Sequence, residues 1–435
     1  MKNDDAALSR RRLLGLGAGA LVSGALAGCD TSTTARGAAT GASSSPLVSA
    51  SGTTSGPTAH VTDSQSAGVT DGTTEGPSAG ATASPTPAVQ GLAGMPAVTD
   101  PHNVYSQAGA NMLLSSVRAD KPLVYVPHNI SGDVSVIDPH TFTVIATYHA
   151  GLEIQHVVPS WDMRTLYATD DLGDQLLPFD PRTGKPGKPI PAMAPYNLYF
   201  TPNGRSAIVV AEALRQLFWY DPHTWKQQDV TSLPGCAGID HADFSADGRT
   251  AVFTAEFAGR VAVVDVASHK LLRTIDMPHR NTHMGPQDIK LAPDGSAYFI
   301  ADSDEGGLWV LDHAATKVVR FIPTGKGAHG LYLSRDAKKL YVSNRLEGSI
   351  SVLDAYTGAK VTKWKIPGGG SPDMGNVTAD GAHLWLSGRY DGVVYVISTR
   401  DGSVTHTIPV GAQPHGLCVW PQPGRYSLGH TGITR

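Results

Sequence analysis

The apolar and polar residues of this chain alternate in a pattern that recurs seven times between residues 123 and 398. Each repeat begins with a short apolar run, passes through a polar turn, and ends in a strand of alternating apolar and polar residues. Asp133-Val-Ser-Val-Ile-Asp138 and Ser349-Ile-Ser-Val-Leu-Asp354 are two of these alternating strands. A period of two residues predicts β-strands rather than helices.

The spacing of the repeats predicts how the strands are grouped. The final residues of the seven alternating strands lie 41 to 47 residues apart, at Asp138, Asp180, Asp221, Asp265, Asp312, Asp354 and Ser398. A repeat of this length is typical of the four-stranded blade of a β-propeller. Pro202-Asn-Gly204 and Pro293-Asp-Gly295 have the composition of the tight turn between the first two strands of a blade.

The two ends of the repeat region predict how the ring closes. The first repeat has no matching first strand before Leu123, whereas Pro414-His-Gly-Leu-Cys-Val-Trp420 has the pattern of a first strand without outer strands after it. Pairing these two pieces removes both exposed sheet edges. The sequence therefore predicts an all-β fold, a seven-bladed β-propeller closed by a C-terminal strand.

The repeat also resembles a known family. Tyr341-Val-Ser-Asn344 with the alternating strand that follows it resembles the YVTN repeat of YncE-like propellers, as does the segment from Val124 to Asp138. The same repeat is similar to the haem-d domain of cytochrome-type nitrite reductases and to lactonase-like propellers. The resemblance covers about residues 122–420 and implies the fold, but these relatives bind or catalyse different things. The Asn of the repeat is kept only at Asn344, so no family binding residue is carried over.

The first 29 residues have the pattern of an export signal. Ser9-Arg10-Arg11-Arg12-Leu13-Leu14 matches the twin-arginine pattern, and Leu26-Ala27-Gly28-Cys29 resembles the lipobox of bacterial lipoproteins. We expect lipidation at Cys29 and a protein held at the outer face of the cytoplasmic membrane, an exported lipoprotein of the actinobacterial type. The alternative is an ordinary secretory signal with a chance cysteine. Twin-arginine export also favours transport in a folded state, as happens when a cofactor is inserted first.

Residues 30–98 are Ser, Thr, Gly, Ala and Pro almost throughout, and no aromatic residue occurs before Tyr105. Such a segment cannot bury enough apolar surface to offset its chain entropy, so we predict a disordered linker. It would act as a tether between residues 1–29 and a propeller domain at 99–435.

The net charge limits the kinds of partner that we expect, and the number of cysteines limits the covalent cross-links. The net charge of −4 argues against nucleic acid, because phosphate binding needs concentrated Lys and Arg. Three cysteines are too few for a disulfide framework. We therefore expect contact with the membrane only through the lipid anchor, and a protein, polysaccharide or small molecule as the ligand.

The histidines carry the main chemical signal. In a propeller the first strand of each blade lines the channel, and it begins on the face where the second strand ends. Seven histidines map to this face, at His128, His156, His241, His279, His283, His329 and His415, together with Asp240, Asp288, Asp302 and Asp373. Imidazole and carboxylate suit Zn, Cu or Fe, so these residues predict a transition-metal or haem site. His279 and His283 lie in the longest connection between blades and are expected to reach furthest inward.

The alternative is that these histidines hydrogen-bond between blades. His156 and His241 align one position away from His329 and His415, so the two pairs are expected to point in different directions. Three functions stay open on the sequence. They are a binding module that uses the upper face of the propeller, a metal- or haem-binding redox protein, and a lactonase-like hydrolase. No catalytic residue is predicted, and the sequence leaves enzymatic activity open.

Overall fold

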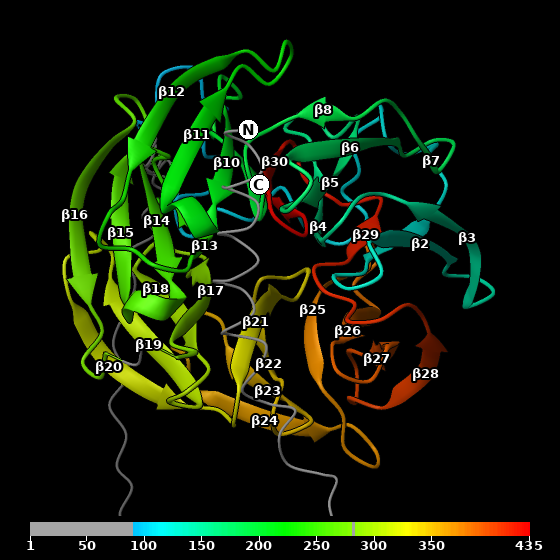
Figure 1. Ribbon diagram of the computed structural model, residues 1–435. Coiled ribbons are helices and arrows are strands. Elements are labelled where there is room, and N and C mark those ends of the chain that lie inside the picture. The colour runs from blue at the N-terminus through cyan, green and yellow to red at the C-terminus, as the bar shows by residue number, and fades with distance from the viewer. Residues whose placement is uncertain (1–89, 281–282) are drawn as a thin grey trace, which may run out of the picture. The chain divides into compact units, whose positions relative to one another are not determined.

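The computed structural model describes residues 90–280 and 283–435, and these residues form seven β-sheets arranged as blades around a central channel (Figure 1). The predicted all-β, seven-bladed propeller is confirmed. The predicted signal, the lipidated Cys29 and the linker up to residue 89 lie outside the described residues. Within the described part of the chain, no helix has the length and apolarity needed to cross a membrane.

The blades follow one another along the chain. Blade 1 contains β1 (Leu123–Pro127), β2 (Asp133–Asp138) and β3 (Thr143–His149). Blade 2 contains β4 (Ile154–Pro159), β5 (Leu166–Asp170), β6 (Gln175–Asp180), β7 (Lys185–Pro186) and β8 (Ile190–Pro191). Blade 3 contains β9 (Asn197–Phe200), β10 (Ala207–Ala211), β11 (Gln216–Tyr220) and β12 (Gln227–Ser232), with the 3₁₀ turn η1 (Glu212–Leu214) after its second strand. Blade 4 contains β13 (Ile239–Phe244), β14 (Thr250–Ala255), η2 (Glu256–Ala258), β15 (Arg260–Asp265) and β16 (Lys270–Asp276).

The remaining blades are regular four-stranded sheets. Blade 5 contains β17 (Pro286–Leu291), β18 (Ala297–Asp302), β19 (Gly307–Asp312) and β20 (Val318–Pro323). Blade 6 contains β21 (Ala328–Leu333), β22 (Lys339–Asn344), β23 (Ser349–Asp354) and β24 (Lys360–Lys365). Blade 7 contains β25 (Pro372–Val377), β26 (His383–Gly388), β27 (Val393–Ser398) and β28 (Val404–Pro409).

The ring closes as the sequence predicted. Strand β29 (Cys418–Trp420) pairs antiparallel with β1, with Leu123 opposite Trp420 and Tyr125 opposite Cys418. The C-terminal strand thus becomes the innermost strand of blade 1. Blade 1 thereby has four strands, like blades 4 to 7, and β1 is paired on both sides.

The burial of the strands explains the repeat pattern. The innermost and second strands, such as β13 and β10, are buried along their whole length because neighbouring blades cover both faces. The outermost strands, such as β3 and β16, have exposed and half-buried residues in alternation. The Asp that closes most repeats is a turn residue. Asp354 Oδ1, for example, accepts hydrogen bonds from the backbone N–H groups of Tyr356 and Thr357.

Two segments outside the repeats close one end of the channel, the end at which the innermost strands finish. We call it the lower end. Residues 90–122 run beneath the blades, where Leu92 and Val104 hydrogen-bond to the turns of blades 4 and 5. The C-terminal tail, residues 421–435, forms a hairpin of β30 (Ser427–Gly429) and β31 (Ile433–Thr434), and β30 pairs with β9. The tail therefore enters the ring beside the innermost strand of blade 3 (Figure 1).

Candidate metal centre

The innermost strands place their histidines at two levels of the channel. Ile154 and Ile239 pair with the last residues of β5 and β14, and a histidine follows each of them two residues later. Ala328 of β21 occupies the equivalent place in blade 6, but there His329 follows one residue later. A register shift lies at this point in each of these strands, and such a shift re-aims side chains. The one-residue offset of His156 and His241 from His329, which the sequence predicted, therefore places these histidines in two separate groups.

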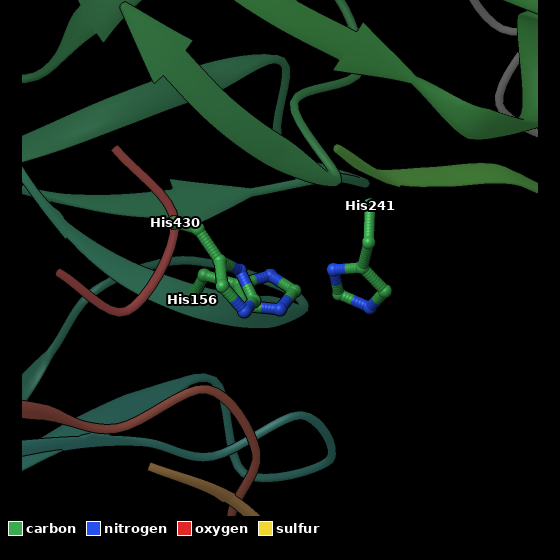
Figure 2. Close-up of side chains that lie close together, drawn as sticks. All are labelled: His156, His241 and His430. Atoms are coloured by element: carbon green, nitrogen blue, oxygen red, sulfur yellow. The ribbon is translucent and has the colours of Figure 1, made fainter. Parts of the chain in front are cut away.

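The first group consists of His156, His241 and His430, which we call the three-histidine cluster. His156 and His241 come from blades 2 and 4, and His430 lies at the tip of the tail hairpin (Figure 2). One ring nitrogen of each lies within 4.8 Å of the other two. The exposed fraction of each residue is 1% or less, so the cluster is sealed from bulk water.

Hydrogen bonds fix the orientation of the three rings. The Nδ1 atom of His156 lies 3.0 Å from the carbonyl oxygen of Tyr196, so Nδ1 is the donor and Nε2 keeps its lone pair. The Nδ2 atom of Asn197 lies 3.1 Å from the Nδ1 atoms of both His241 and His430, while its Oδ1 accepts from the backbone N–H of Leu198 at 2.9 Å. Among the described residues, no hydrogen-bond partner reaches the Nε2 atom of any of the three rings.

Burial keeps these imidazoles neutral. It lowers the pKa of His156 to about 3, because a charged ring would lose its hydration in the channel. The pKa values of His241 and His430 are also held well below 6.5, first by burial and then by repulsion from the neighbouring imidazoles and from Lys290. A neutral imidazole is the form that binds a metal ion.

The second group consists of His329, Asp373 and His415, from the adjacent blades 6, 7 and 1, and we call it the His–Asp–His cluster. One ligating atom of each lies within 4.8 Å of the other two. His329 Nδ1 lies 3.0 Å and His415 Nε2 lies 3.7 Å from a carboxylate oxygen of Asp373. The two groups are neighbours, because the ring centroids of His156 and His415 are 4.7 Å apart.

Two arginines accompany the carboxylate. Arg345 follows β22 and its Nη1 donates to Asp373 Oδ1 at 3.2 Å, while Arg389 Nη1 lies 3.9 Å from Oδ2. Burial raises the pKa of Asp373, and these guanidinium groups oppose that effect. The pKa of His329 and of His415 is lowered by burial and by the arginines.

Four other predicted residues do not belong to either cluster, although two of them lie next to a cluster histidine. His128 is buried at the top of blade 1, where Nε2 accepts from the backbone N–H of Gly411 at 3.3 Å and burial lowers its pKa to about 4. Asp240 Oδ2 lies 3.9 Å from His241 Nε2, and Asp288 Oδ1 lies 3.9 Å from His430 Nε2. Asp302 ends β18, and its carboxylate accepts from Trp309 Nε1 at 3.0 Å.

The structure keeps His279 and His283 away from the channel, contrary to the expectation that their loop reaches inward. Their side chains are 66% and 67% exposed, and they face Glu305 and Asp304 across 3.0 and 3.9 Å. The physical reason is local, because these two acidic residues in the neighbouring turn of blade 5 attract the imidazoles. Residues 281–282 between them lie outside the described residues.

Sequence reasoning missed three residues of the centre. His430 lies after the last repeat, in Arg425-Tyr-Ser-Leu-Gly-His-Thr-Gly432, and no periodic pattern assigns that segment to the channel. Arg345 and Arg389 directly follow the second strands of adjacent repeats, at equivalent positions on the upper face. Their equivalent positions in two adjacent repeats could have predicted that both arginines lie on the same face as the histidines.

Comparison with known proteins agrees with the architecture. Residues 300–423 match the family model described as YNCE-like beta-propeller. The resemblance to YncE-like propellers predicted from the repeat is confirmed over these residues. No curated protein matches the sequence.

Several solved structures share the fold at low identity. Hydrazine synthase of Kuenenia stuttgartiensis is similar with a TM-score of 0.52 and 17% identity over 62% of this chain and 91% of that chain. The dihydro-heme d1 dehydrogenase NirN, solved in complex with DHE, has a TM-score of 0.51 and 16% identity over 70% of this chain and 77% of its own. A putative 6-phosphogluconolactonase from Bacteroides uniformis has a TM-score of 0.55 and 20% identity, covering 68% and 99%. At these identities the likeness concerns the fold alone.

Proposed function

We propose that this propeller is a metal-binding protein that holds a transition-metal ion at His156, His241 and His430. The observation that carries the proposal is the convergence of three buried, neutral imidazoles whose Nε2 atoms have no hydrogen-bond partner among the described residues. A buried polar atom without a partner costs about 1–3 kcal/mol. Three buried imidazoles that each bring a ring nitrogen within 4.8 Å of the other two are explained if a metal ion binds there.

The donor set indicates the kind of ion. Three neutral imidazoles suit Zn²⁺, Cu²⁺ or Ni²⁺ better than Mg²⁺ or Ca²⁺, which prefer oxygen ligands. Three protein ligands also leave a coordination position open, as in catalytic rather than purely structural zinc sites. The bound ion would supply Lewis-acid or redox chemistry in a channel that excludes water.

The surrounding residues act as an outer shell. The carbonyl of Tyr196 holds Nδ1 of His156, and the amide of Asn197 holds Nδ1 of the other two rings. As the side chain lies, Asn197 Nδ2 donates to these two Nδ1 atoms, and this leaves the hydrogen of each ring on Nε2. An ion at Nε2 would therefore require the Asn197 amide to turn over and give up the hydrogen bond that its Oδ1 accepts from Leu198 N–H. Asp240, beside His241, is an additional oxygen donor within reach of the cluster.

A haem does not fit the channel as it is folded. The tail hairpin fills the space between the inner strands, and the imidazole rings of His156, His241 and His430 are separated by centroid distances of only 4.8 to 5.4 Å. A planar macrocycle would have to displace the tail. A general binding role of the upper face and a lactonase-like activity are supported by the fold alone.

A buried metal site is compatible with folded export. Because the ligands are sealed from solvent, the ion is best inserted while the chain folds, before the twin-arginine route moves it. We propose that the folded protein is then anchored at Cys29 on the outer face of the membrane. Cys29→Ala should move it from the membrane fraction to the soluble fraction, and unchanged membrane association would exclude lipid anchoring.

The metal proposal is tested with protein purified without chelator and with apoprotein refolded in the presence of Cu²⁺. We expect bound copper by mass spectrometry and nitrogen couplings from imidazole in its electron paramagnetic resonance spectrum. A bound ion should also raise the melting temperature, because it stabilises only the folded state. His430→Gln should weaken copper binding at this cluster at least 10-fold, since outer-shell losses alone reach that size.

Two control variants separate ligation from folding. His140→Gln changes an exposed histidine in a turn of blade 1 and should leave copper binding unchanged. Leu428→Ala weakens the packing of the tail, where Leu428 is fully buried, but keeps the ligand. Copper binding lost equally in Leu428→Ala and His430→Gln would mean that tail docking, not ligation, is being measured. The absence of bound transition metal in every preparation would overturn the proposal.

A further inference from the structure

The His–Asp–His cluster has its own unfilled hydrogen-bonding positions. His415 Nδ1 lies 3.1 Å from Gln155 Oε1, and Gln155 Nε2 donates to Glu153 Oε1 at 3.0 Å. The bond to Glu153 fixes which end of the Gln155 amide faces His415, because only Nε2 can donate to a carboxylate. His415 Nδ1 is therefore the donor, and its Nε2 carries a lone pair.

That lone pair points toward another acceptor. His415 Nε2 lies 3.7 Å from Asp373 Oδ2, which has no hydrogen-bond partner among the described residues. His329 Nδ1 lies 3.0 Å from the other oxygen but at an angle that makes no hydrogen bond, and it also has no partner there. Two acceptors that face each other in a buried site repel unless a cation lies between them.

We propose that His329, Asp373 and His415 bind a second metal ion next to the one proposed at the three-histidine cluster. The channel would then hold a two-metal centre. The inference extends the proposed function but has its own ligands, so either position can fail without the other. A shared proton is the competing explanation, but 3.7 Å is too long for a hydrogen bond between Asp373 and His415.

The charges of the channel can accommodate a second cation. Arg345 occupies Oδ1 of Asp373 and leaves Oδ2 for an ion. The buried carboxylate of Asp240 and the half-buried carboxylate of Glu256 interact with each other, and Glu256 also interacts with Arg345 and Arg389. Glu256 therefore adds to Asp373 in offsetting the charge of the two guanidinium groups. Two imidazoles and one carboxylate form a mixed nitrogen and oxygen donor set that suits zinc or iron.

The position of the two clusters favours a pair rather than two unrelated sites. His156 of the first cluster and His415 of the second have ring centroids 4.7 Å apart, and His241 and His329 are 6.1 Å apart. The clusters therefore contact each other through two pairs of rings. Ions held this close could bind a substrate atom between them, which is the use of other two-metal sites.

The test measures the number of Zn²⁺ ions bound to the whole chain by equilibrium dialysis and mass spectrometry. Wild type should bind two equivalents, and His430→Gln and Asp373→Asn should each bind one. His415→Gln is the second variant for this cluster, because it leaves Asp373 paired with Arg345 and so is less disruptive to folding. Asp302→Asn, which changes a buried carboxylate at the end of β18, is the matched control and should bind two.

The outcomes separate the two proposals. One equivalent in wild type that is lost in His430→Gln but kept in Asp373→Asn and His415→Gln would overturn the second position and leave the proposed function intact. One equivalent with the reverse pattern would support the second position and overturn the first. No bound zinc and no bound copper in wild type would overturn both. With Cu²⁺ instead of Zn²⁺, a filled pair should show fewer detectable spins than copper ions, because neighbouring ions couple.

Discussion

The ring of blades and the C-terminal tail reach the same channel by opposite routes. Each blade repeats a strand pattern, and its inner strand is buried because neighbouring blades cover it. The tail has no repeat, and its short strand β30 pairs with β9, which lies far from it in the sequence. Yet the tail supplies one histidine of the three-histidine cluster, while the blades supply the other two. The blades are thus built from a repeated sequence pattern, whereas the three-histidine cluster is completed by a segment that does not follow this repeat.

The tail is held by more than its strand pairing. The side chain of Arg435 donates to Asp243 Oδ1 at 2.9 Å and to the carbonyl oxygen of Phe244 at 2.7 Å, and the residue is 1% exposed. Tyr105, from the segment beneath the blades, donates to Asp243 Oδ2 at 3.2 Å. The two segments outside the repeats therefore meet at one buried carboxylate. This contact lies toward the end of β13, beyond His241 of the three-histidine cluster.

Two truncations separate the ring from the tail. Deleting residues 415–435 removes β29 with the tail, so β1 loses its partner and blade 1 exposes a long edge. We expect an aggregating product with no cooperative thermal transition, because exposed edges pair between molecules. Size-exclusion chromatography and calorimetry measure the effect. A soluble monomer with an unchanged melting temperature would contradict the closure of the ring by β29.

Deleting only residues 427–435 should give the milder result. The ring keeps β29, so the product should be soluble and folded, with a melting temperature lower by about 5–10 °C from the lost tail packing. It should lose the metal ion of the three-histidine cluster, because His430 is removed. Metal analysis of this variant tests whether the tail is needed for the metal site but not for the folding of the ring. Aggregation as severe as in the longer deletion would mean that the tail is part of the scaffold.

The smallest expected effect concerns pH. Burial lowers the pKa of His156 to about 3 and keeps the pKa of His241 and His430 well below 6.5, so protons compete with the metal only in strongly acidic solution. Metal affinity should therefore change little between pH 7.5 and pH 5. An exposed imidazole of ordinary pKa would weaken as a ligand about 30-fold at pH 5.

Equilibrium dialysis with Zn²⁺ at both pH values measures this effect. The control is a peptide with an exposed pair of histidines, which should release zinc over the same range. A loss of the same size in the protein would show that its ligands are solvated. In that case the burial seen in the channel would not describe the metal-binding state.

The predicted and unpredicted parts of the site differ in their sequence context. His156, His241, His329 and His415 were predicted because each begins an inner strand, and the strand pattern fixes that position. His279 and His283 were predicted from loop length alone, and the structure places them in solvent next to Glu305 and Asp304. The length of a loop limits how far its side chains can reach, but it does not determine the direction in which they point. In this loop the neighbouring carboxylates determine that direction.

The sequence by itself determined the blades, their number and the closing strand, because a two-residue alternation and a fixed repeat length leave few other folds. It also determined the face on which the histidines lie. Only the tertiary structure decided which of them meet. The one-residue offset between His156 and His329 becomes two levels of a channel only when the blades curve into a ring. The place of His430 depends on β30 pairing with β9, more than 200 residues away in the chain, and no local pattern encodes a contact of that separation.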